Sequence, residues 1–91
     1  MNKFELQKNI EEVGIQKNSY SLDGGLQGEE YVLSDNGYGI WSVNYSEKGE
    51  RIGEKNFFSE SEACYYLFQQ LISDITENQI RKEYNFIKRI R

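Results

Sequence analysis

Histidine is absent from this sequence and cysteine occurs once, at Cys64. Without histidine, the chain has no Ser-His or Cys-His nucleophile system, no His-ligated metal site and no imidazole base near neutral pH. A single cysteine forms neither an internal disulfide nor a multi-thiolate zinc site. We therefore predict a protein that is not an enzyme and that uses no cofactor or metal.

Long apolar runs are missing as well. No stretch approaches the roughly 18 consecutive apolar residues that span a bilayer. Residues 1–12 contain no apolar run followed by a small-residue cleavage site, the pattern of a secretory signal. We expect a cytoplasmic protein without a membrane partner.

The composition is otherwise that of a small globular domain. Of the 91 residues, 37% are hydrophobic and 14% are aromatic. This content is enough for a small core, and it is too aromatic for a disordered chain. The length favours a single domain over 1–91.

The N-terminal segment has the periodicity of an amphipathic helix. Leu6, Ile10 and Val13 share one face, and Gly14 suits a left-handed residue that ends the helix. The spacing predicts a helix over about 2–13. The following residues, 15–28, include three glycines and are predicted to be irregular. Such a loop either folds back on one end of the core or contacts a partner directly.

Three strands are predicted next, over 30–34, 40–45 and about 51–57. A two-residue turn between the first two would pair Val32 with Trp41. A turn one residue longer pairs Leu33 with Trp41 and Tyr31 with Val43, which collects apolar side chains on one face. We expect the second register.

Two helices are predicted at the C-terminal end. Ser59 and Glu62 fit a capping box, and Thr76 fits a second cap. The stripe after the first cap contains Cys64, which we interpret as a buried structural cysteine. The two stripes are Ala63, Cys64, Leu67, Phe68, Leu71 and Ile72, then Ile80, Tyr84 and Ile87. The predicted fold is α+β: an N-terminal helix, a three-stranded antiparallel meander, and two C-terminal helices packed on one face.

Charge is distributed unevenly along the chain. Residues 1–77 carry 14 acidic and 6 basic side chains, whereas 78–91 carry one acidic and five basic ones. The basic end either complements the dipole of its own helix or contacts nucleic-acid phosphates. The acidic body would repel phosphate, so we predict no direct nucleic-acid partner.

Acidic residues and tyrosines lie together around the predicted sheet. Carboxylates pair with Arg and Lys, and tyrosine supplies rigid contact area, so this mixture suits a surface that binds a basic protein. The alternative is a solvated, solubilising surface. The candidate partner-binding residues are Asp23, Glu29, Glu30, Asp35, Tyr38, Glu47 and Glu50.

Four segments carry a family resemblance: YSLDGGL at 20–26, EYVL at 30–33, WSVNYSEKG at 41–49 and FSESEAC at 58–64. Over roughly 20–72 the pattern resembles small bacterial immunity proteins of polymorphic toxin and contact-dependent growth inhibition systems, in particular the immunity protein 59 family. The resemblance implies 1:1 binding and neutralisation of a cognate toxin, commonly a nuclease with a basic cleft. The first helix and the basic C-terminal helix are less typical of this pattern.

Three other functions are the alternatives to this one. A non-enzymatic interaction or regulatory module without a toxin partner, including a dimeric one, fits the same composition. A double-stranded-RNA-binding module has the same element order but needs basic residues where this chain has Ser59-Glu60-Ser61-Glu62. An enzyme that acts through carboxylates alone, such as a hydrolase with an acid and a base, has no supporting spacing, and we predict no small-molecule substrate.

Overall fold

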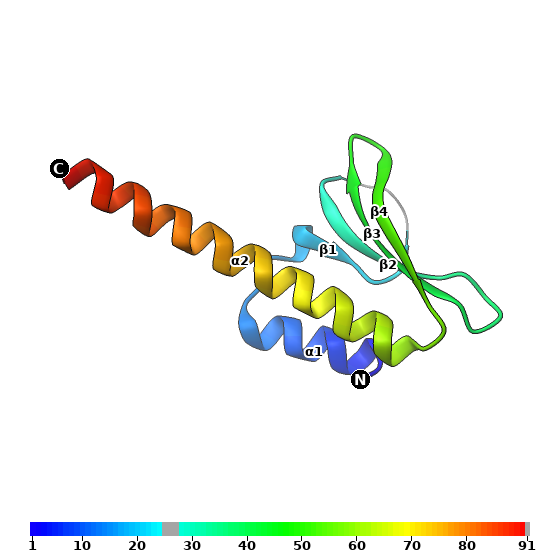
Figure 1. Ribbon diagram of the computed structural model, residues 1–91. Coiled ribbons are helices and arrows are strands. Elements are labelled where there is room, and N and C mark those ends of the chain that lie inside the picture. The colour runs from blue at the N-terminus through cyan, green and yellow to red at the C-terminus, as the bar shows by residue number, and fades with distance from the viewer. Residues whose placement is uncertain (25–27, 91) are drawn as a thin grey trace.

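The computed structural model describes residues 1–24 and 28–90, and for 78–90 it describes the helix backbone alone. The strands form one mixed sheet in the order β1-β2-β3-β4, in which β1 is parallel to β2 and the other pairs are antiparallel. Helix α2 crosses one face of the sheet and α1 packs beside it (Figure 1). The elements are α1 (Lys3–Val13), the 3-10 turn η1 (Lys17–Ser19), β1 (Tyr20–Ser21), β2 (Glu30–Asp35), β3 (Trp41–Glu47), β4 (Glu50–Phe57) and α2 (Glu60–Ile90).

The α+β class is right, but the predicted three-stranded antiparallel sheet is wrong. Strand β1 adds a fourth, parallel strand of two residues. Two residues are too few to show a period-two pattern in the sequence. Within the loop predicted over 15–28, the side chains of Ile15, Tyr20 and Leu22 are buried in the core, so its described part folds back rather than projecting.

The two predicted C-terminal helices are one helix. Thr76, expected to cap the second, lies inside the 31-residue α2. A cap pattern does not interrupt a helix by itself, and no glycine follows Gly53 and no proline occurs in the chain. The predicted stripe of Ile80, Tyr84 and Ile87 lies outside the side chains that the structure describes.

Helix α1 confirms most of the N-terminal prediction. The side chain of Asn2 accepts a hydrogen bond from the Glu5 N–H, and Gly14 ends the helix at φ +87°. Val13 is 49% exposed, so its expected place on the buried face is wrong. The turn at Gly14 sends the N–H of Ile15 back to the carbonyl of Ile10, and Ile15 is buried instead.

The three predicted strands are present, but the register of the first pair differs. Leu33 pairs with Val43 rather than with Trp41, and Tyr31 pairs with Tyr45. The connection between β2 and β3 is longer than the tight turn that we expected, which shifts the pairing by two residues. A shift of two residues leaves each side chain on its face, so the predicted apolar face survives.

The core lies between this face of the sheet and the helices. Ser59 caps α2 as predicted, with its Oγ 3.3 Å from the Glu62 nitrogen. Cys64 has no exposed surface, and burial raises the pKa of its thiol to about 11, which agrees with a structural cysteine. The core consists of Leu6, Ile10, Ile15, Tyr20, Leu22, Leu33, Val43, Ala63, Cys64, Leu67 and Leu71.

Candidate functional site

The seven predicted binding residues do not form one surface. Two of them belong to the connection between β2 and β3. Asp35 accepts a hydrogen bond from the Gly37 N–H at 3.0 Å, so its carboxylate stabilises the turn. Tyr38 is fully exposed near the tip, with φ +55°.

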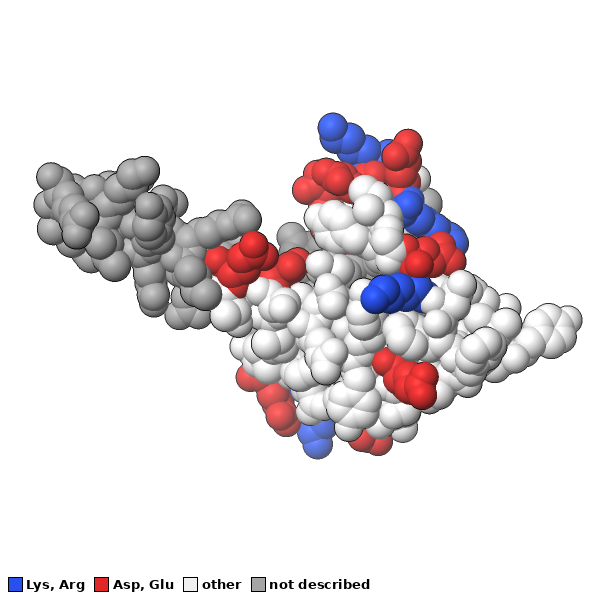
Figure 2. Space-filling model, viewed as in Figure 1, with Lys and Arg blue, Asp and Glu red and all other residues white. Residues whose placement is uncertain are grey.

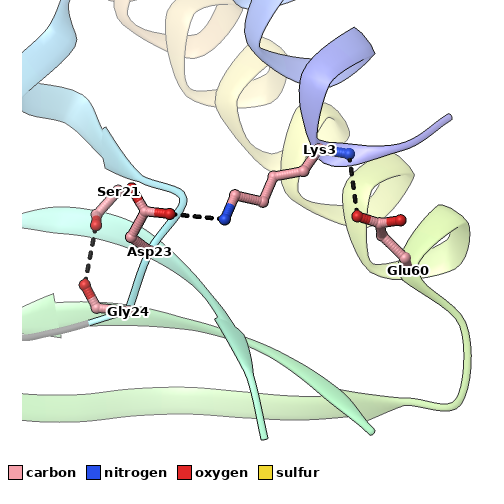
Figure 3. Close-up of polar contacts among 5 residues, drawn as sticks. All are labelled: Lys3, Ser21, Asp23, Gly24 and Glu60. Carbon is pink, nitrogen blue, oxygen red and sulfur yellow. Dashed lines mark hydrogen bonds and ion pairs between the residues drawn. The ribbon is translucent and has the colours of Figure 1, made fainter. Parts of the chain in front are cut away.

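Asp23 is paired with a base. Its Oδ1 lies 2.6 Å from Lys3 Nζ, and the backbone N–H of Lys3 donates to Glu60 (Figure 3). These contacts link the segment after β1 to the starts of α1 and α2. Because its charge is neutralised locally, Asp23 contributes less than an unpaired carboxylate to attraction of a basic partner.

Glu30 does not lie on the surface at all. It is 7% exposed and pairs with Ser46 on the face of the sheet that points away from the core residues. The same face buries Ser42 and Asn44. In the described part of the chain, Glu30 Oε1 and the side-chain polar atoms of the other three make no hydrogen bond. Its burial removes Glu30 from the candidate surface.

The remaining predicted residues gather at the β3–β4 end of the sheet. Glu47 and Glu50 face each other across the hairpin, and Glu29 directly precedes the strand residue that pairs with Ser46. Acidic side chains gather at this end of the sheet and at the middle of α2, with uncharged surface between them (Figure 2). We call Glu29, Glu47, Glu50 and the α2 residue Asp74 the acidic end.

A cavity of about 160 Å³ opens between η1, the strands β2 and β3, and α2. Tyr31 and Tyr45 pair across β2 and β3, with ring centroids 5.0 Å apart and planes inclined at 59°. The carboxylate of Asp74 acts on the hydroxyl of Tyr31. The lining of this tyrosine cavity is Ile15, Ser19, Glu29, Tyr31, Tyr45, Leu71, Asp74 and Ile75.

The carboxylates act on both tyrosines. Burial, followed by the hydrogen bond and the charge of Asp74, raises the pKa of Tyr31 to about 12. Burial, followed by the charges of Glu29, Glu47 and Asp74, raises the pKa of Tyr45. A negative potential that opposes phenolate formation also favours a cation at the same place.

A second hollow, of about 200 Å³, shares Tyr31 and Tyr45 and extends towards β4 and Tyr66. Beside it, Lys55 Nζ lies 5.0 Å from the centroid of the Tyr66 ring. The ammonium group of Lys55, on β4, thus already lies over a tyrosine ring of α2.

Asp74 was not among the residues predicted from the sequence, and Tyr31 was predicted only as part of the apolar face of the sheet. One signal could have found Asp74. It follows Leu67 and Leu71 at i+7 and i+3, so a helix places this carboxylate on the face that packs against the sheet. An acid in that position needs a partner, and Tyr31 provides one.

The part of the chain that the structure describes shows no metal site and no membrane span. Those residues contain no group of three carboxylate or thiol side chains placed to hold a metal ion. They also contain no helix long and apolar enough to cross a membrane. Comparison with protein-family models, with curated proteins and with solved structures gave no match.

Proposed function

We propose that this protein is a cytoplasmic immunity protein that binds a cognate toxin domain with a basic surface and neutralises it without catalysis. One observation carries the proposal: Glu29 and Asp74 line an open cavity with a tyrosine pair in its wall, and the charge of Glu47 acts on Tyr45 of that pair. Unlike-charged surfaces accelerate association, and tyrosine is enriched at the centre of interfaces. The resemblance of residues 20–72 to immunity proteins supplies the toxin as the class of partner.

The proposed contact is narrower than the surface expected from the sequence. It uses Glu29, Glu47 and Glu50 and adds Asp74. It leaves out Glu30, which is buried, and the residues whose carboxylates are engaged elsewhere, Asp23 and Asp35.

The test is a binding assay between the full chain and the C-terminal domain encoded by the adjacent upstream gene, together with rescue of cells that express that domain. The triple variant E29K/E47K/E50K should slow association by more than about tenfold, because it reverses the charge that attracts the partner. It should also weaken the rescue.

The matched control is E5K/E11K/E12K, which makes the same change in net charge on exposed positions of α1. It should change the association rate by less than about twofold, and circular dichroism should show that both variants are folded. Failure of the toxin domain to bind, or an equal effect of both variants, would contradict the proposal.

A self-associating interaction module is the second candidate. The observation that favours it is the length of α2, which continues well past the sheet (Figure 1). Sedimentation of the isolated protein separates the two candidates: a dimer at micromolar concentration supports self-association, and a monomer that binds the toxin domain supports the immunity role.

A further inference from the structure

The size of the tyrosine cavity selects the kind of ligand. Its volume of about 160 Å³ is below the roughly 300–1,000 Å³ that is usual for sites that enclose a small organic ligand. The space matches one side chain that enters from a bound protein.

The lining selects the chemistry of that side chain. Ile15, Leu71 and Ile75 give apolar walls, which suit the methylene stem of a long residue. Tyr31 and Tyr45 also line the cavity, and the face of a tyrosine ring attracts a cation. A long side chain with an apolar stem and a cationic end satisfies both parts of the lining.

The charges select a cation over an anion. Of the described residues that line the cavity, Glu29 and Asp74 carry charge, and both charges are negative. Asp74 interacts with the Tyr31 hydroxyl, and a carboxylate has lone pairs for about four donors. It therefore keeps acceptor positions for a ligand.

Arginine meets these requirements better than lysine. Its planar guanidinium stacks on aromatic rings and donates to two acceptors at once, whereas an ammonium is a compact and strongly hydrated charge. We infer that the tyrosine cavity receives one arginine side chain of the protein partner, stacked against Tyr31 and Tyr45 and paired with Glu29 and Asp74. The inference rests on the proposed function for the partner, whereas the chemistry of the cavity can be tested without it.

The first experiment titrates the full ¹⁵N-labelled chain with the tripeptide acetyl-Gly-Arg-Gly-amide, followed by NMR. Amides of residues 29–31, 45 and 74 should shift saturably. The matched probe contains citrulline, which has the shape of arginine without its charge, and should bind at least about tenfold more weakly. Equal binding of the two peptides, or shifts confined to other residues, would overturn the inference.

The second experiment compares two substitutions that each remove one negative charge. Asp74→Asn should weaken arginine-peptide binding at least about fivefold, because the carboxylate that pairs with the guanidinium is lost. Asp35→Asn is the control at the other hairpin, where an amide oxygen still accepts from the Gly37 N–H. If Asp74→Asn does not fold, Glu29→Gln at an exposed position takes its place. If Asp74→Asn and Asp35→Asn weaken peptide binding equally, the peptide responds to net charge and not to the cavity. That result would overturn the inference.

The same variants separate this inference from the proposed function. Arginine-peptide binding that Asp74→Asn abolishes, without any binding of the toxin domain, supports the cavity and removes the toxin as its partner. Toxin binding that E29K/E47K/E50K weakens and that Asp74→Asn and Glu29→Gln leave unchanged supports the proposed function and overturns the arginine site.

Discussion

The two hairpins at opposite ends of β3 combine the same residue types for different purposes. At the β2–β3 end, the carboxylate of Asp35 is bonded to its own turn, and Tyr38 is exposed on all sides. At the β3–β4 end, Tyr45 packs on Tyr31, and the charges of Glu29, Glu47 and Asp74 act on Tyr45. The same residue types line a shared cavity only where tertiary packing brings several of them together.

The largest expected effect is a loss of stability when a side chain of the core that supports both hairpins is truncated. Leu67→Ala should lower the free energy of unfolding by about 2–5 kcal/mol, because Leu67 is fully buried between α2 and the sheet. Val13→Ala, at an exposed position, should cost less than about 0.5 kcal/mol. Urea denaturation measures both. Similar losses in the two variants would contradict the assigned core.

The two turns should be equally sensitive to replacement of their glycines, although their acidic and tyrosine side chains make different contacts. Gly37 and Gly49 both have φ +80° and open space around them. Substitution of either by alanine should cost about 1–2 kcal/mol, because a Cβ disfavours left-handed backbone. Thermal denaturation of the two variants measures the cost. A large difference between them would show that one turn relaxes when its glycine is replaced.

Alkaline pH should act at the acidic end. The pKa of Tyr31 is raised to about 12, first by burial and then by Asp74, above the value near 10 of an unfolded tyrosine. Its contribution to stability is therefore complete below pH 10 and is lost as the pH rises to about 12. The stability of the wild-type chain should fall more steeply over this interval than that of Tyr31→Phe. Parallel curves would contradict the assignment.

The smallest expected effect is at Asp35. Asp35→Ala should cost about 0.5–1 kcal/mol, because it removes one exposed hydrogen bond within the turn. It should leave the Tyr31 titration, followed by NMR of the tyrosine rings, unchanged. Asp74→Asn should lower the pKa of Tyr31 but keep it above 10, since burial is the larger cause. Movement of the Tyr31 pKa in Asp35→Ala would show that the two ends are coupled.

Local features of the fold followed from the sequence because they depend on neighbours a few residues apart. The helix end at Gly14 and the Ser59 cap follow from local capping patterns. The burial of Cys64 and of Leu33 follows from helical and strand periodicity. Val13 shows the limit of this reasoning. It has the helical spacing of a buried residue but is exposed, because the turn after Gly14 places Ile15 in the core instead.

Only the tertiary structure decided the parallel strand β1, the unbroken α2 and the register of β2 with β3. It also brought Asp74 close to the hydroxyl of Tyr31 and buried Glu30 on the face of the sheet opposite the core. Each of these outcomes depends on which distant segments pack together, and periodicity within one segment carries no such information. The sequence by itself determined which residues are acidic, aromatic or core-forming, and the packing of α2 on the sheet determined which of them meet.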